Sequence, residues 1–196
     1  MAITALLTPA VGARTAPDPR EAVAYFAGGC FWGTEAVYEH VRGVLSVTSG
    51  YSRYNSTPEL SPSPIAVESV RITYDPSKVS YHSLLDVFFS IAHDPTTRDR
   101  QGPDIGPEYR AVVLVQNGDE QHEAEAFIAA LTARRAFPRP IVTEVRQLAG
   151  FVAAEALHQD YAARHPDDPY IRLNDQPKLI RLKERFSELY QPARAR

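Results

Sequence analysis

The sequence predicts an α+β domain of two layers, in which helices flank a mixed, largely antiparallel sheet. Segments with the period-two pattern of strands alternate along the chain with segments whose apolar residues follow helical spacing. Two strand-like segments are separated only by a Pro- and Ser-rich loop, as in an antiparallel hairpin. The length of 196 residues fits one domain, expected over residues 21–192 after a leader over residues 1–20.

Each element follows from a local pattern. The apolar run AVAYFA predicts a strand at 22–27, and the spacing of Val37, Val41 and Val44 predicts a helix that starts at Phe31 and stops near Gly43. Strands are expected at 44–52, 67–75, 110–116 and 141–148, and further helices at 80–93 (opened by Ser80), 119–135 (after Asn117-Gly118), 153–165 and 177–190.

Composition excludes several classes of function. The 21 Lys and Arg against 24 Asp and Glu give a net charge of −3, without the basic excess of a nucleic-acid binder. No apolar run approaches the ~20 residues that span a bilayer, so a membrane span is not expected. The leader starts with an apolar stretch but lacks a preceding basic residue. We therefore expect a cytoplasmic protein and a monomer, with export left open if the leader is a signal remnant.

Cys30 is the only cysteine, which excludes an internal disulfide, a CxxC pair and a Cys-only metal site. It follows Gly28-Gly29 at the start of a predicted helix, where backbone N–H groups and the helix dipole favour an anion. This position predicts a thiolate that forms easily, beside an apolar wall of Phe31 and Trp32. The alternative is a tight turn whose Cys30 and aromatic residues only fill the core.

Three polar residues could complete a site. Glu68 lies on the same strand face as Val70 and Ile72, where burial would raise its pKa and make it a proton donor; a solvated strand end is the alternative. Asp104 and Tyr109 lie in a long Gly- and Pro-rich connection at 93–110. They are either hydrogen-bonding groups for a polar substrate or a turn residue and a strand-end anchor.

Four motifs occur in one order: GCFWGTE, ESVRITYDPSKVSY, HDPTTRDRQGPDIGPEYR and HQDYAARHPDDPYI. Together they resemble the methionine sulfoxide reductase A family over residues 23–190. The resemblance implies that family's two-layer fold, no metal and no organic cofactor. It also implies reduction of the S epimer of methionine sulfoxide, free or in oxidised proteins, as a repair reaction under oxidative stress.

By matching motif, Cys30 would attack the sulfoxide sulfur and become a sulfenic acid, while Phe31 and Trp32 would hold the substrate methyl group. Glu68 would protonate the sulfoxide oxygen, and Asp104 and Tyr109 would orient water and bind that oxygen. The family's resolving cysteines are absent, so an external thiol must regenerate Cys30. Thioredoxin, or glutathione with glutaredoxin, would supply it.

The segment at 53–64 departs from the family pattern. Ser56 stands where the family has a second active-site tyrosine. The role of that tyrosine is either lost or taken by Tyr54, which we expect to bind substrate. This departure leaves open a sulfoxide-binding module with weakened catalysis. A Cys-His hydrolase with His93 or His158 as the base is a further alternative, although the Phe31-Trp32 wall suits a methyl group better than a peptide carbonyl.

Overall fold

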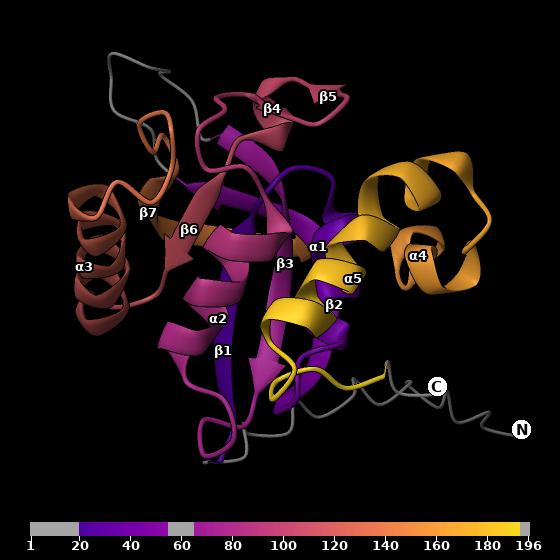
Figure 1. The fold of residues 1–196 in the computed structure, drawn as a ribbon, viewed down its shortest axis with the longest axis horizontal. Helices are drawn as coiled ribbons and strands as arrows, with labels where there is room; N and C mark the ends of the chain where they lie inside the picture. Colours follow the sequence, from indigo (N-terminus) through magenta and orange to yellow (C-terminus); the bar gives the residue numbers. More distant parts are fainter. Residues whose placement is uncertain (1–19, 55–64, 193–196) are drawn as a thin grey trace, which may run out of the picture.

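Five of the strands form one sheet that closes on itself, and Figure 1 shows these strands packed against helices. The computed structural model describes residues 20–54 and 65–192. In that part of the chain the strand order is β1 (Ala22–Ala27), β3 (Ile65–Tyr74), β2 (Val44–Tyr54), β7 (Glu144–Ala153) and β6 (Val112–Val115), with β6 returning to β1. The predicted leader over residues 1–20 and the loop with Ser56 lie almost wholly outside the described residues.

The predicted mixed, largely antiparallel sheet is confirmed. Neighbouring strands are antiparallel except for β6 and β7, which are parallel with Val112 opposite Glu144. The structure adds the closure of this sheet into a barrel through β1 and β6. Closure depends on which distant segments pair, and a local period-two pattern carries no such information.

Each side of the sheet has its own core. One face points into the barrel, where five residues from four strands pack together: Ala27, Tyr54, Val67, Val112 and Leu114. The other face packs against the helices in the larger cluster, where Phe26, Val70 and Ile72 of the sheet meet helical residues such as Phe88. Because Phe26 and Ala27 are adjacent yet both fully buried, β1 separates two apolar environments.

The helices on the outer face are α1 (Phe31–Glu39), α2 (Tyr81–Val87) with a π-helical turn to Ala92, α3 (Gly118–Ala133) and α5 (Gln176–Arg185). Figure 1 shows α1, α2 and α5 over the sheet and α3 at its edge. Ser80 caps α2 by accepting the Ser83 N–H, and Asn117 caps α3 by accepting the Glu120 N–H. None of the helices in the described part of the chain is long and apolar enough to cross a membrane.

The predicted helix at 153–165 is wrong. β7 runs to Ala153 beside β2, and only a 3₁₀ turn (Ala156–His158) and the single turn α4 (Tyr161–Arg164) follow it. The Gln159 side chain holds this segment by bonding the N–H and C=O of Ser49 and the C=O of Ala154. These tertiary hydrogen bonds replace those that a helix would have supplied.

Two other helices end early. α1 stops at Glu39, and α5 stops at Arg185 because the chain beyond it returns to bond the α1–β2 connection. There Arg42 donates its N–H to Leu189, and Val41 forms a β-bridge with Tyr190. The connection at 93–110 contains a small hairpin of β4 (Arg100–Gln101) and β5 (Asp104–Ile105). In Figure 1 this hairpin stands above the end of the sheet.

Candidate active site at Cys30

Cys30 lies at the N-terminal end of α1, directly after the turn from β1. The turn needs its glycines. Gly29 has φ +90°, which favours glycine, and a Cβ there would clash with Cβ of Gln101. A Cβ on Gly28 would lie 2.8 Å from the ring of Phe88. The chain can therefore bring Cys30 close to both the β4–β5 hairpin and the core only through these two glycines.

The Cys30 thiol is half-buried, and its pKa is raised to about 12. Burial is the main cause, and the nearby carboxylate of Glu68 adds to it. Hydrogen bonds from the Trp32 backbone N–H and the Tyr170 hydroxyl act in the opposite direction but are weaker. The prediction of an easily formed thiolate is thus wrong for the substrate-free site, because desolvation and a like charge outweigh the helix terminus.

Glu68 lies on β3 with its carboxylate at the start of α1. Its Oε2 accepts the Phe31 N–H at 3.1 Å. Burial raises the pKa of Glu68 to about 7, with help from Asp104 and Glu108, while the Phe31 hydrogen bond opposes the shift. Of the two alternatives left by the sequence, the structure supports the desolvated carboxyl and not the solvated strand end. A carboxyl with this pKa is suited to proton transfer near neutral pH.

Asp104 and Tyr109 both reach this region from the 93–110 connection. Asp104, on β5, accepts a hydrogen bond from the Tyr170 hydroxyl, which also bonds to the Cys30 thiol. Tyr109 ends a 3₁₀ turn, and its pKa is raised to about 12 by burial and then by the charges of Glu68, Asp104 and Cys30. The structure therefore brings the predicted polar residues together around the thiol.

Sequence reasoning missed Tyr170, which links Cys30 to Asp104. Burial and the two acidic neighbours raise the pKa of Tyr170, so its hydroxyl remains a hydrogen-bond donor. The residue lies within the HQDYAARHPDDPYI motif, 140 positions after Cys30. Only that motif indicated this segment, because a single tyrosine in an irregular stretch has no helical or strand periodicity around it from which its position could be predicted.

The predicted aromatic wall is present. Phe31 is buried and meets Tyr51 edge-to-face, with ring centroids 5.6 Å apart. Trp32 stacks on Tyr161 with centroids 3.8 Å apart and meets Tyr170 edge-to-face at 5.9 Å. His158 packs against the rings of both Phe31 and Trp32. Such a surface favours an apolar, polarizable group.

Tyr54 does not belong to this site. It is fully buried inside the barrel with Val67 and Leu114, so the prediction that it binds substrate is wrong. The cause is strand parity, since residues three positions apart on β2 face opposite sides of the sheet. Tyr51 is the tyrosine of β2 that points to the site, where Glu68 and Cys30 raise its pKa after burial, the main cause.

His93 is not available as a base for Cys30. Its two ring nitrogens lie 2.9 Å from the Phe88 carbonyl and 2.9 Å from the Thr143 hydroxyl. Burial lowers the pKa of His93 to about 4. His158 lies against the aromatic wall, and the hydrogen bond that Cys30 receives from a side chain comes from Tyr170. Among residues 20–54 and 65–192, no histidine is hydrogen-bonded to the Cys30 thiol, so the described part of the chain lacks the thiol–imidazole pair that a Cys-His hydrolase needs.

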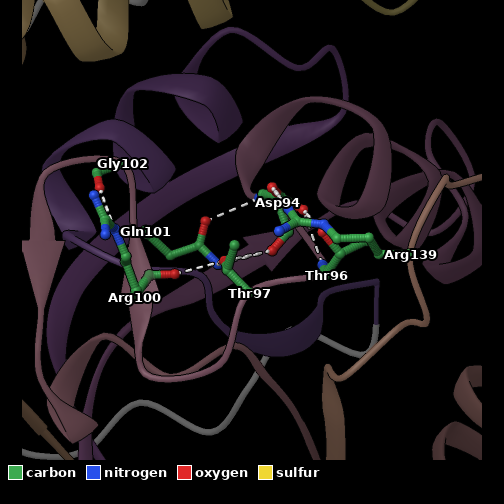
Figure 2. Close-up of polar contacts among 7 residues, drawn as sticks. All are labelled: Asp94, Thr96, Thr97, Arg100, Gln101, Gly102 and Arg139. Carbon is green, nitrogen blue, oxygen red and sulfur yellow. Dashed lines mark hydrogen bonds and ion pairs between the residues drawn. The ribbon is translucent and has the colours of Figure 1, made fainter.

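A cavity of about 230 Å³ opens beside Cys30. Gly28, Cys30, His93 and Asp94 line one part of it, and Tyr170 and residues of α5 line another. Figure 2 shows the hydrogen bonds that hold its wall at 94–102. Among residues 20–54 and 65–192, no group of three His, Cys, Asp or Glu side chains is placed to hold a metal ion.

The family model described as peptide methionine sulfoxide reductase matches residues 22–190. The chain is 42% identical over 177 residues to peptide methionine sulfoxide reductase MsrA 2 of Mesorhizobium japonicum, covering 88% of this chain and 91% of that one. It is 39% identical over 178 residues to peptide methionine sulfoxide reductase MsrA of Thermus thermophilus, covering 88% of this chain and 99% of the relative.

Solved structures give the same result. Reduced Mxr1 from Saccharomyces cerevisiae matches with a TM-score of 0.65 and 27% identity, covering 78% of this chain and 90% of Mxr1. Methionine sulfoxide reductase A of Corynebacterium diphtheriae matches with a TM-score of 0.61 and 27% identity, covering 76% of this chain and 77% of that protein. The fold expected from the four motifs is thereby confirmed.

Proposed function

The chain belongs to the peptide methionine sulfoxide reductase family, and we propose from this premise that Cys30 carries out the reduction of the S epimer of methionine sulfoxide. The enzyme is an oxidoreductase whose reaction consumes thiols, in keeping with the repair of oxidised proteins under oxidative stress. One observation supports the assignment most strongly: a lone thiol, a carboxyl with a pKa near 7 and an aromatic wall meet at the start of α1.

In the proposed reaction the Cys30 sulfur attacks the sulfoxide sulfur, and the S–O bond breaks. The oxygen passes to Cys30 as a sulfenic acid, and methionine is released: Cys–SH + R₂S=O → Cys–SOH + R₂S. The thiol supplies the two electrons that the sulfoxide gains. Phe31 and Trp32 hold the methyl group, and Trp32 keeps its orientation because it is stacked on Tyr161.

The two shifted pKa values fit this step. The pKa is about 7 for Glu68 and about 12 for Cys30. At a pH between these two values, the pair holds one proton, mainly on the sulfur. Its transfer to the substrate oxygen through Glu68 creates the thiolate where it is consumed. The nucleophile is thereby protected until a sulfoxide is bound. Tyr109 and Tyr170 donate hydrogen bonds to the oxygen as charge develops on it, and Asp104 orients the Tyr170 hydroxyl by accepting a hydrogen bond from it.

Regeneration requires an external thiol, because the chain has one cysteine. We propose a thioredoxin, or glutathione with glutaredoxin, as the source of electrons, acting on a monomer. Mxr1 of S. cerevisiae has been solved in complex with Trx2. The substrate would be methionine sulfoxide, either free or in an oxidised protein.

Single-turnover product analysis tests the proposal. The thiol-reduced enzyme, freed of reductant and mixed with excess S-sulfoxide, should release about one equivalent of methionine, and the R epimer should give none. Cys30→Ser should give no product while its circular dichroism spectrum is retained, since a hydroxyl is a far weaker nucleophile at the same size. Binding of the sulfoxide without product would indicate a binding module instead, and product from Cys30→Ser would exclude Cys30 as the nucleophile.

A further inference from the structure

The cavity beside Cys30 has a second end that the reduction of a sulfoxide does not use. Neither Phe31 nor Trp32 lines it. Instead it extends from Cys30 past Tyr170 to Lys178 and Arg181 on α5. At about 230 Å³ it is close to the lower limit of pockets that hold small molecules, roughly 300–1,000 Å³, and far too small for a folded partner.

Among the described residues, four charged side chains line this cavity, and three of them are already paired. Asp94 forms an ion pair with Arg139 at 3.2 Å and accepts hydrogen bonds from Thr96, while Asp104 accepts from the Tyr170 hydroxyl. Lys178 lies 3.2 Å from Oδ1 of Asp175, which is buried behind the cavity. These pairs reduce the charge that the two acids present to a ligand.

Arg181 is the fourth charged group and differs from the others. It is exposed, and within residues 20–54 and 65–192 no side chain or carbonyl engages its guanidinium. Lys178 and Pro177 stand at i−3 and i−4, and Glu184, at i+3 on α5, forms no ion pair with Arg181 in the described part of the chain. The α5 end of the cavity therefore presents an available guanidinium, a group suited to bidentate recognition of a carboxylate.

The opposite wall is held in place by Gln101. Its side-chain amide accepts the Asp94 N–H and donates to the Asp94 carbonyl, both at 2.9 Å, and to the Thr97 hydroxyl at 3.1 Å (Figure 2). Gln101 packs so closely against Gly29 that no Cβ fits between them. The cavity next to the thiol is thus a preformed site and needs no rearrangement to accept a small ligand.

We propose that this cavity binds the reducing thiol, a small molecule of the glutathione class that carries carboxylates, with one carboxylate on Arg181 and the thiol directed to Cys30. This inference rests on the proposed function. The step is Cys–SOH + R′SH → Cys–S–S–R′ + H₂O, in which the reductant sulfur displaces hydroxide as water. A second thiol then releases Cys30 and leaves with R′S as a disulfide.

The test measures the rate at which preformed Cys30 sulfenic acid is consumed. The enzyme is oxidised by one turnover of S-sulfoxide, then mixed with glutathione or with glutathione diethyl ester, which has the same thiol without the carboxylate charges. Arg181→Glu should slow the reaction with glutathione by about tenfold relative to the ester. The matched control, Arg172→Glu, makes the same charge change at an exposed position outside the cavity and should leave both rates within about twofold.

Three results would overturn the inference. Equal slowing of glutathione and its ester, or equal effects of the Arg181 and Arg172 variants, would show that no carboxylate is held at Arg181. A sulfenic acid that forms normally but reacts with thioredoxin and not with glutathione would also exclude a small-thiol site. By contrast, failure of the wild-type enzyme to form any sulfenic acid would contradict the proposed function itself, so the two failures are distinguishable.

Discussion

Replacing Glu68 by glutamine separates the chemical role of this side chain from its structural role. The amide oxygen can still accept the Phe31 N–H that Oε2 accepts now at 3.1 Å, so the start of α1 keeps its anchor. The variant loses the acidic proton and the negative charge. Because general acid catalysis contributes about 10²- to 10⁴-fold, sulfoxide reduction in a single turnover should slow by that factor.

The same substitution should stabilise the protein relative to wild type once the pH rises above about 5. Burial raises the pKa of Glu68 from an ordinary 4.5 to about 7, so the folded state holds a proton that the unfolded state has lost between these values. Wild-type stability from this group is complete below pH 4.5 and falls as pH rises through 7, by about 3 kcal/mol. Glutamine does not titrate, so the Glu68→Gln variant does not lose this stability. Its free energy of unfolding relative to that of wild type should therefore increase between about pH 5 and 8.

The variant should also alkylate faster at Cys30. Removing the Glu68 carboxylate removes one cause of the raised pKa of the thiol, so iodoacetamide should react faster at about pH 8 to 9. The three assays are quench-flow methionine formation, urea unfolding at about pH 5 and 8, and alkylation followed by intact mass. A single-turnover rate within about threefold of wild type would refute Glu68 as the acid, and unchanged pH dependence of stability would refute its buried, shifted carboxyl.

Two further substitutions test the surroundings of the thiol. Tyr170→Phe removes the hydroxyl that bonds Cys30 and Asp104, so the pKa of Cys30 should rise further and alkylation at about pH 9 should slow by about 2- to 10-fold; faster alkylation would count against this hydrogen bond. Gly29→Ala forces a Cβ against Gln101 at φ +90°, which should cost about 1–3 kcal/mol in urea unfolding; a neutral effect would contradict the close approach.

Structural features that depend on a local sequence pattern were predicted correctly. The period of two along β3 placed Glu68 on the face of Val70 and Ile72, and both of those residues are fully buried. The two glycines before Cys30 predicted a turn into a helix, and the structure has that turn. Such features need only a few neighbouring residues, and steric rules within the backbone decide them.

Features that depend on distant contacts were missed. The pKa of Cys30 is raised by burial and by Glu68, which lies 38 positions away in the sequence. The local helix terminus alone predicted a lowered pKa, which was wrong. Tyr170 reaches the thiol only because the irregular segment after β7 folds back over α1. The choice between Tyr54 and Tyr51 turned on which face of β2 is inside the barrel, and the barrel itself was not predicted.

The mass of the intact protein after one turnover in the absence of thiol tests most directly whether the sulfoxide oxygen passes to Cys30. We expect a gain of one oxygen atom, located on the peptide that contains Cys30 and trapped by a sulfenic-acid reagent, together with about one equivalent of methionine. Adding glutathione should then convert this species into a mixed disulfide on Cys30. A full equivalent of methionine alongside an unmodified Cys30 thiol would show that the reduction does not proceed through Cys30.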